Sequence, residues 1–333
     1  MITEIDGRAS LAGVPLACPA DKQPLTPAGD ELRCARGHSY PLVGGVPILL
    51  DRDVPDNHPY FEESRRAGQS GTNGAGGRPD ATAAGAVDPF VQQEIVKTNG
   101  ILYRGVLGQL SRYPIPDLPL PQATGGESFL DVGCNWGRWS VAADQRGYRA
   151  IGIDPGIAGI QAAYRVAAAL GRGPAFVVGD GRSLPFPDGT FDVVFSYSVL
   201  QHFSKPDAKL SIREAARVAK PGGKVLIQLA NLLGARQLYN QARDTIRGEQ
   251  NPFRVRRWTP GEMLSTFNEL VGPARLSADG FFSLNAQVSD ADLLRPFPRA
   301  VVKASQALKQ ASRRIPPLTM FADSLFVEAT RTG

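Results

Sequence analysis

From Ser128 onward, short apolar runs alternate with segments of helical periodicity. Four runs have the length and composition of buried strands and end in Gly, Asp or Ser: SFLDVG (128–133), RAIGID (149–154), AFVVGD (175–180) and FDVVFSYS (191–198). Between the first three, WGRWSVAADQRG and IAGIQAAYRVAAAL repeat apolar residues at helical spacing, and DAKLSIREAARVAK predicts another helix before the strand KVLIQLA. This alternation predicts an α/β fold, with parallel strands, right-handed crossovers and helices on both faces of the sheet.

The rest of the chain divides by pattern and composition. The first 60 residues hold short apolar runs split by turn residues, which predicts a small β-rich module. A stretch of Gly, Ala and polar residues follows, and such a composition predicts a flexible linker. Two late apolar runs, ARLSADGFFSL and DSLFVEAT, suggest a closing antiparallel pair. The predicted units are the module (1–60), the linker (61–89) and a main domain (90–333) with a core (125–232), a substrate or lid region (233–323) and a closing strand (324–331).

Composition limits the possible classes of protein. The chain has 333 residues, of which 42% are apolar, enough for one large core and a small second unit. The formal net charge of +5 includes no block of consecutive basic residues, so a nucleic-acid tail is not indicated. Three cysteines, no signal peptide and no long uncharged apolar run lead us to expect a cytoplasmic protein without disulfides or a membrane span.

Glycines and carboxylates lie at the predicted strand ends, where ligands bind in folds of this kind. Gly133 and Gly137 enclose a turn between strand and helix, with a spacing that does not fit the dinucleotide fingerprint G-x-G-x-x-G. Asp154 ends the second strand, where it could accept hydrogen bonds from both ribose hydroxyls or cap the next helix. Asp180 and Gly181 end the third strand and suit the edge of an adenine; a plain turn is the alternative.

Four segments in order resemble the "type 11" branch of class I S-adenosylmethionine methyltransferases. They are LDVGCNWG, GIDPG, GDGRSLPFPDGTFDVVFSYSVLQHF and ARVAKPGGKVLI, and the resemblance covers about residues 125–232. It implies S-adenosylmethionine as the cofactor and a Rossmann-like sheet of seven strands with an antiparallel last strand. Asn135 stands where the family usually has Gly, and Asn tolerates left-handed backbone better than most residues do.

The same resemblance assigns cofactor-binding roles. It implies that residues of the first turn and of the fourth strand line the methionine part, and that the ends of the second and third strands hold the ribose and the adenine. The implied residues are Asp131, Gly133, Gly137 and Ser196 for the methionine, Asp154 for the ribose, and Asp180 and Gly181 for the adenine.

Transfer of an activated methyl group needs alignment above all, and an oxygen nucleophile can also need a general base. His202 follows the fourth strand and is the first candidate for that base, with Tyr197 second; a packing or capping role is the alternative for His202. Arg254, Arg256 and Arg257 with Trp258 would offer guanidinium donors and an aromatic face to a carboxylate or phosphate of the substrate. They could instead lie on a solvated face.

The segment 16–50 resembles the zinc-ribbon modules of some methyltransferase activators and of ribosomal-RNA guanine methyltransferases. Cys18, Asp21, Cys34 and His38 stand at the ligand positions, and two thiolates, one carboxylate and one imidazole could complete a tetrahedral zinc site. Asp is a poor replacement for Cys in structural zinc sites. The alternative is a ribbon without metal, held together by the apolar run 46–50.

We therefore predict methyl transfer to oxygen or nitrogen of a small biosynthetic molecule. The alternatives are an RNA methyltransferase, which the ribbon suggests but the mild charge disfavours, and a non-catalytic regulatory protein that binds the cofactor. A nicotinamide dehydrogenase is disfavoured by the glycine spacing. The predicted partner is a small-molecule substrate, not a nucleic acid or a membrane, and the sequence leaves the oligomeric state open.

Overall fold

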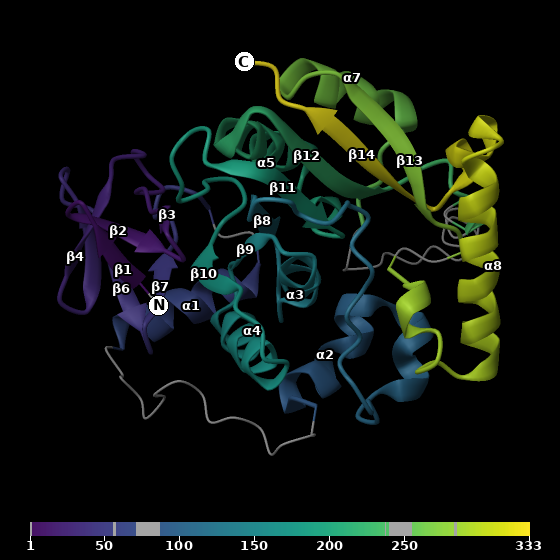
Figure 1. Cartoon of the computed structure of the whole chain (residues 1–333), viewed down its shortest axis with the longest axis horizontal. Helices are drawn as coiled ribbons and strands as arrows, with labels where there is room; N and C mark the ends of the chain where they lie inside the picture. Colours follow the sequence, from purple (N-terminus) through teal and green to yellow (C-terminus); the bar gives the residue numbers. More distant parts are fainter. Residues whose placement is uncertain (1, 56–57, 71–86, 237, 240–254, 283–284) are drawn as a thin grey trace.

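The computed structural model describes residues 2–333 except 56–57, 71–86, 237, 240–254 and 283–284. At its centre is a mixed β-sheet with helices packed against it (Figure 1). Seven strands from the C-terminal part form most of it: β8 (Ser128–Val132), β9 (Arg149–Asp154), β10 (Ala175–Gly179), β11 (Phe191–Tyr197), β12 (Ala219–Ala230), β13 (Ala274–Gly280) and β14 (Ser324–Thr330). Their order is β13-β14-β12-β11-β8-β9-β10, and β14 is antiparallel to both of its neighbours.

Helices cover both faces of this sheet, which confirms the predicted α/β class. Alternate residues of β8 pack into different clusters: Phe129 joins Trp139 of α3 on one face, and Leu130 joins Ile212 of α5 on the other. The alternation follows from the two-residue period of a strand. The helices of this part are α3 (Arg138–Gln145), α4 (Ile157–Ala169), α5 (Lys205–Val218), α7 (Pro260–Leu270) and α8 (Pro296–Ser312).

The N-terminal module extends the central sheet. Its first three strands form a sheet of their own and the other four continue beyond β10, so the large sheet has eleven strands where the sequence predicts seven. All of β7 is buried, and Ile48 pairs in parallel with Val178 of β10. An apolar run needs cover on both faces: Ile48 packs with Phe61 in one cluster, and Leu49 packs with Val177 in another. The strands are β1 (Ile2–Ile5), β2 (Arg8–Leu11), β3 (Val14–Pro15), β4 (Leu25–Ala28), β5 (Glu31–Cys34), β6 (Ser39–Val43) and β7 (Val46–Leu49).

The predicted linker over 61–89 is wrong in its first part, because helix α1 (Pro59–Gln69) occupies it. Phe61 is only 3% exposed, and the Ser64 hydroxyl, also buried, donates to the Pro155 carbonyl at 2.6 Å. The same hydroxyl accepts the Ile157 N–H at 2.9 Å, at the first turn of α4. The local composition does not predict this helix, because the helix is stabilised by packing on α4 and not by its own helical propensity. Residues 71–86 of the predicted linker lie outside the described residues.

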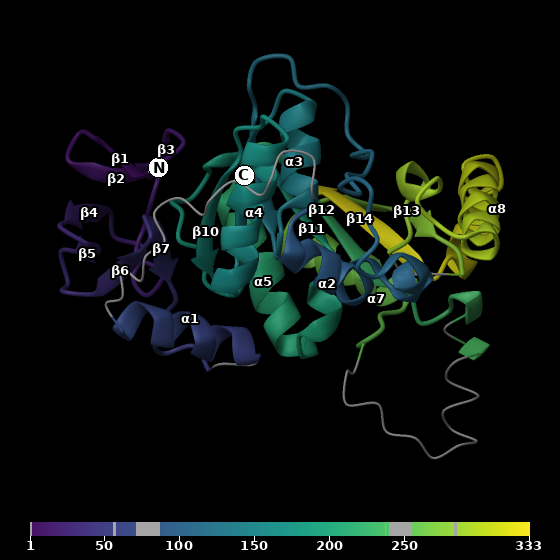
Figure 2. The same ribbon diagram turned by 90° about the horizontal axis from the view of Figure 1, so that it is seen from below.

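Two further regions flank the strand ends (Figure 2). Helix α2 (Pro89–Asn99) and the 3-10 segment η1 (Ile101–Val106) pack with Trp136 and with residues just before α8. Buried Arg138 pairs with Asp290 at 2.9 Å, and the Tyr103 hydroxyl donates to the same carboxylate at 2.5 Å. Short 3-10 turns precede and follow α8, namely η3 (Val288–Asp290) and η4 (Pro316–Phe321). Within the described residues, every helix is too short or too polar to cross a membrane.

The Ser64 hydroxyl joins α1 to the start of α4, so Ser64→Ala should destabilise the chain. Ile157 N–H and the Pro155 carbonyl would lose a buried partner, and we expect the free energy of unfolding to fall by about 1–3 kcal/mol. Urea unfolding measures this. Ser70→Ala at the exposed end of α1 is the matched control. Equal stability of the two variants would contradict the role assigned to Ser64.

Candidate functional site

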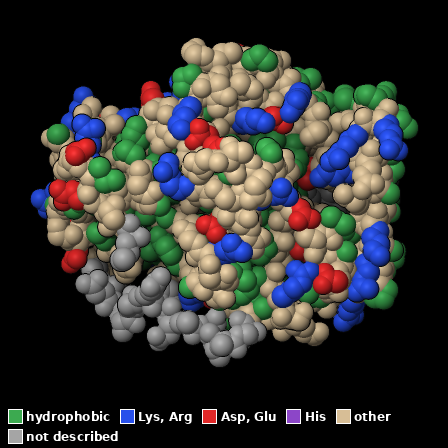
Figure 3. Space-filling view, viewed as in Figure 1, with side chains coloured by type: hydrophobic (Ala, Val, Ile, Leu, Met, Phe, Trp, Pro, Cys, Tyr) green, Lys and Arg blue, Asp and Glu red, His purple; other side chains and the backbone are tan. Residues whose placement is uncertain are grey.

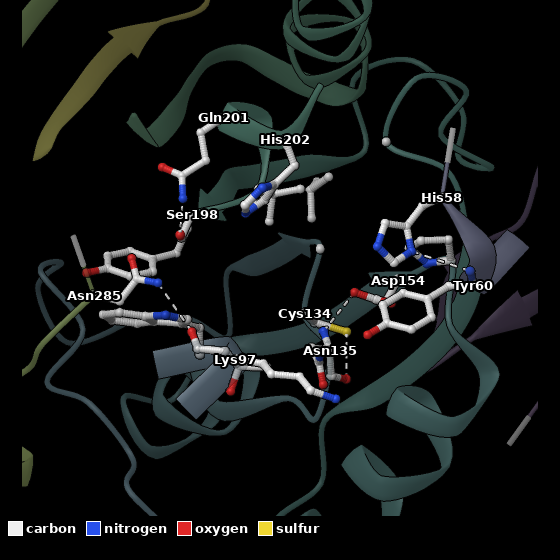
Figure 4. Close-up of a pocket in the computed structure, with 18 of the residues that line it drawn as sticks. His58, Tyr60, Lys97, Cys134, Asn135, Asp154, Ser198, Gln201, His202 and Asn285 are labelled. Atoms are coloured by element: carbon white, nitrogen blue, oxygen red, sulfur yellow. Dashed lines mark hydrogen bonds between the residues drawn. The ribbon is translucent and has the colours of Figure 1, made fainter. Parts of the chain in front are cut away.

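A cavity of about 700 Å³ lies at the carboxyl ends of β8, β9, β10 and β11, with walls from α1, α2 and the residues around Asn285. Figure 4 shows its two ends: Asp154, Tyr60 and His58 lie on one side, and Ser198, Gln201 and Asn285 on the other. His202 and Cys134 lie between them. The volume suits a ligand the size of a nucleoside together with a second small molecule.

The turn between β8 and α3 is built from three residues with left-handed backbone. Gly133, Asn135 and Gly137 have φ of 79°, 45° and 78°. A Cβ at Gly133 would lie 2.2 Å from a methyl group of Val199, and one at Gly137 would lie 2.8 Å from the Phe176 ring. Glycine is therefore required at both ends of the turn. Asn135 has the left-handed backbone expected at a position where the resembling family usually has Gly.

Asp154 connects this turn to the next loop. One carboxylate oxygen accepts the Asn135 N–H at 3.0 Å, and the other accepts the Gly156 N–H at 2.9 Å. Burial raises the pKa of Asp154 to about 6, although both N–H groups act in the opposite direction. Helix α4 has Gly156 as its N-cap, so the alternative capping role of Asp154 is wrong. Each oxygen keeps lone-pair capacity toward the cavity.

Two of the predicted cofactor residues do not line the cavity. Asp131 is buried below the turn, accepts a hydrogen bond from the Ser140 hydroxyl at 2.7 Å, and has its pKa raised to about 7 by burial. The Ser196 hydroxyl donates to the Val132 carbonyl at 2.9 Å and so ties β11 to β8. Direct lining roles for both residues are therefore wrong. Ser198, two residues on and at φ 63°, takes the place that was predicted for Ser196.

Asp180 and Gly181 line the cavity, and Asp180 is already paired within the protein. The guanidinium of Arg182 binds its carboxylate at 2.8 and 2.9 Å and reaches the Pro55 carbonyl at 2.8 Å. The same guanidinium lies over the rings of Phe61 and Phe203. This end of the cavity therefore combines aromatic rings with a carboxylate that is paired with Arg182. Arg182 was not predicted as a site residue, because no local sequence pattern indicates that its side chain folds back onto Asp180.

The two candidate bases differ in their surroundings. His202 lies in η2 (Leu200–His202) and lines the cavity, and burial lowers the pKa of its imidazole to about 4, so it is neutral near pH 7. Tyr197 also lines the cavity, but its hydroxyl donates to Asp279 at 2.8 Å. Burial and the Asp279 charge raise the pKa of Tyr197 well above its usual value. Tyr197 is therefore unsuited to act as a base, whereas His202 is unprotonated near pH 7 but is a weaker base than a free imidazole.

The residues predicted to bind the substrate do not all lie in the cavity. Arg257 lines the cavity. Arg256 instead donates to the His202 carbonyl at 2.8 Å and so supports η2. Trp258 is 1% exposed and packs in the core, where Lys205 lies 5.3 Å from its ring, so its predicted substrate role is wrong. Arg254 lies outside the described residues.

Several cavity residues were missed by sequence reasoning. Tyr60 and His58 come from the end of the predicted N-terminal module, and Asn285 comes from a loop without a motif. Among the described residues, six buried polar side-chain atoms lack a hydrogen-bond partner, and all six residues line this cavity. Unpartnered buried polar atoms are rare in native proteins, and their gathering around this cavity distinguishes it from the rest of the described core. The atoms are Glu94 Oε2, Asn99 Nδ2, Asn135 Oδ1, Arg138 Nε, Gln201 Oε1 and Asn285 Oδ1.

A second cluster lies in the N-terminal module. Cys18, Asp21, Cys34 and His38 bring one ligand atom each to within 4.8 Å of one another. His38 Nδ1 is 3.4 Å from each sulfur and 3.2 Å from the Asp21 carboxylate, which in turn is 3.5 Å from Cys34 Sγ. Ligands of tetrahedral zinc with normal bond lengths lie about 3.3–3.8 Å apart. The side chains predicted as ligands therefore meet in a geometry that fits the metal.

Part of the chain that lines the cavity is similar to known proteins. Residues 130–227 match the family model described as a methyltransferase domain, so the chain contains such a domain. A norajmaline N-methyltransferase from Rauvolfia serpentina is 36% identical over 104 residues, 30% of this chain and 35% of that protein. A Bos taurus protein named "Probable tRNA methyltransferase 9B" is 34% identical over 103 residues, 31% of this chain and 21% of its own length. The chain therefore spans about a third or less of these relatives.

The magnesium protoporphyrin IX methyltransferase of Synechocystis, solved with bound SAH, aligns with 62% of this chain and 75% of its own. The TM-score is 0.42 and the sequence identity 17%.

The lowered pKa of His202 predicts a dependence of stability on pH. The unfolded imidazole binds a proton near pH 6.5 and the folded one only near pH 4, so the free energy of unfolding falls as pH drops through this window. We expect His202→Gln to lose less stability than the parent chain between about pH 7 and about pH 4.5, by roughly 1–3 kcal/mol. Asp131 and Asp154, whose raised pKa values act in the opposite sense, affect both proteins alike. Urea unfolding at the two pH values tests this, and identical losses would contradict it.

Proposed function

We propose that this chain uses its methyltransferase domain to transfer a methyl group from S-adenosylmethionine to an oxygen or nitrogen of a small molecule. The observation that carries the proposal is the junction of the left-handed turn at Gly133–Gly137 with Asp154 at one edge of the cavity. Asp154 has both oxygens anchored by backbone N–H groups, and their remaining lone pairs suit the two hydroxyls of a ribose. Glycine backbone beside it permits a close approach of the ligand.

The surroundings of Asp180 suit an adenine. Phe61 and Phe203 line the cavity here and lie about the guanidinium that holds Asp180, and aromatic rings favour a flat, apolar heterocycle. The Gly181 backbone lies at the same strand end. Asn135 Oδ1 is buried without a partner in the turn and can accept a hydrogen bond from the amino-acid part of the cofactor.

The chemistry requires little more from the protein than positioning. The cofactor supplies a methyl group that is already activated, so the walls of the cavity have to align the acceptor and exclude water. His202 is neutral near pH 7 and lies between the two ends of the cavity, where it can take up the proton of a hydroxyl acceptor. Arg256 holds the backbone of His202 in place.

A small acceptor is favoured over RNA because the formal net charge of the chain is only +5 and no block of consecutive basic residues occurs in it. On the face drawn in Figure 3, Lys and Arg side chains are scattered among Asp and Glu and form no continuous basic strip.

We further propose that the N-terminal cluster holds a zinc ion. Two sulfurs, one imidazole nitrogen and one carboxylate oxygen are a ligand set that zinc accepts, and their separations fit a tetrahedron. The metal would tie the loop after β3 to the hairpin of β5 and β6, and from there support the strand β7 that docks on β10.

Calorimetric titration with S-adenosylhomocysteine, the demethylated cofactor, tests the proposed activity. We expect one binding site per chain. In Asp154→Asn the affinity should fall by about tenfold or more, because the amide cannot accept hydrogen bonds from both backbone N–H groups and both ribose hydroxyls. Asp53→Asn, on an exposed loop, is the matched control and should bind normally. No heat from the folded parent chain, or unchanged affinity in Asp154→Asn, would refute the proposed site.

Metal analysis of the purified protein tests the zinc proposal. We expect about one zinc per chain, and less than about a fifth of that in Cys34→Ser, because loss of one thiolate from a four-ligand site removes most of the affinity. Cys134→Ser, far along the chain in the cavity turn, is the control and should keep its metal. A parent chain that remains free of zinc after purification with the metal present would contradict the assignment.

A further inference from the structure

The end of the cavity opposite Asp154 is lined by part of an arginine-rich connection between β12 and α7. This connection, residues 231–259, contains six arginines against one Asp and one Glu, which gives it a net charge of +4. The whole chain has a net charge of +5, so most of the excess lies in this short stretch. Arg236 and Arg257, near the two ends of the connection, both line the cavity.

The position of Arg236 follows from its bond to a neighbouring loop. A terminal nitrogen of its guanidinium donates to the carbonyl of Phe282, which lies shortly before Asn285 in the chain. Asn285 is on the side of the cavity away from Asp154 in Figure 4. The side chain of Arg236 is only half-buried, and a bond to a carbonyl leaves its charge and its other N–H groups for a ligand.

Arg257 lies at the same end of the cavity. The backbone N–H of the preceding residue, Arg256, donates to the Gln201 carbonyl at 2.7 Å, and Gln201 is on the same side as Asn285 in Figure 4. The side chain of Arg257 is also half-buried. Two guanidinium groups from separate parts of one connection therefore line the same end of the cavity.

The acidic residues that line the cavity, among the described residues, are engaged elsewhere. Asp154 accepts two backbone N–H groups at the opposite end. Glu94 pairs with Lys97 at 2.8 Å, and Asp180 pairs with Arg182 at 2.8 Å. None of these carboxylates is paired with either arginine of the connection.

The other charges near this end form pairs of their own. Buried Arg138 pairs with Asp290 at 2.9 Å, and Asp279, which accepts the Tyr197 hydroxyl, lies 3.8 Å from Lys309. S-adenosylmethionine brings a sulfonium and an ammonium against one carboxylate, so it adds positive charge to the cavity. This end therefore favours a negatively charged ligand, and a guanidinium suits a carboxylate or phosphate because it can donate two parallel hydrogen bonds.

We propose that the methyl acceptor is a small molecule with an anionic group, a carboxylate or a phosphate, which Arg236 and Arg257 hold; this inference rests on the proposed methyltransferase function. The anionic group binds at the arginine end of the cavity, and the atom that receives the methyl group lies between it and the cofactor. An uncharged molecule of the same shape lacks the ionic contact and binds more weakly.

The test uses the full chain saturated with S-adenosylhomocysteine and ligand-observed saturation-transfer NMR. The anionic probes are benzoate, lactate, phenyl phosphate and glycerol phosphate, and their uncharged counterparts are benzamide, lactamide, phenol and glycerol. We expect saturation of at least one anion and little of its uncharged counterpart. The anions that bind also show whether the site takes a carboxylate or a phosphate.

Arg236→Gln and Arg257→Gln remove one charge each and keep most of the side-chain length. Each should weaken the binding of that anion by about tenfold or more, the loss expected for a charge-assisted hydrogen bond, while affinity for S-adenosylhomocysteine stays within about threefold. Arg313→Gln, exposed at the end of α8 and outside the cavity lining, is the matched control and should bind the anion as the parent chain does.

The possible results separate this proposal from the one on which it rests. A folded protein that does not bind S-adenosylhomocysteine refutes the proposed methyltransferase function itself. Normal cofactor binding with equal saturation of anions and uncharged counterparts, with no saturation of any anion, or with anion binding unchanged in both cavity variants overturns the anionic acceptor alone. A loss of S-adenosylhomocysteine affinity of about tenfold in the cavity variants would show that these arginines hold the carboxylate of the cofactor, and would also overturn it.

Discussion

The carboxylate of Asp154 is the interaction on which the cavity depends. It accepts one N–H from each of two loops, at Asn135 and Gly156, and so fixes the ends of β8 and β9 side by side. Burying a carboxylate is costly, and the raised pKa of Asp154 reflects that cost. The turn can reach Asp154 only because Gly133 and Gly137 adopt left-handed backbone where a side chain would collide with its neighbours. The hydrogen bonds of the site and its steric requirement for glycine therefore depend on the same turn.

The N-terminal part is built into this site and does not stand apart from it. Strand β7 pairs with β10, α1 is bonded through Ser64 to the start of α4, and Arg182 reaches from Asp180 to the carbonyl of Pro55. Through these contacts, the segment that carries Tyr60 becomes a wall of the cavity. A ribbon stabilised by a metal would thus stabilise the end of the cavity assigned here to the adenine and ribose.

The sequence predicts what depends on local pattern. Parallel strands, the helices that follow them and the positions of Gly133, Asp154 and Gly181 could be predicted, because strand ends in this topology meet at one edge. It does not predict partners chosen by tertiary packing. Ser196 and Trp258 have residue types common in binding sites, yet one ties two strands and the other fills the core.

The same limit explains the features missed at the walls of the cavity. Helix α1 has the composition of a linker and becomes ordered by contact with α4 through Phe61 and Ser64. The amide oxygens of Gln201 and Asn285 belong to no motif, and only the three-dimensional arrangement shows that no described residue bonds to them. Acceptor specificity is therefore the part of the function furthest from the sequence.

The most direct measurement of the central claim is an amide NMR titration of the isotope-labelled chain with S-adenosylhomocysteine. If the junction at Asp154 cradles the nucleoside, the largest shifts will fall on the backbone amides of Asn135, Gly156 and Gly181, with smaller ones on Tyr60. Shifts confined to other surfaces, or a spectrum of the folded protein that does not change at saturating ligand, would contradict the account.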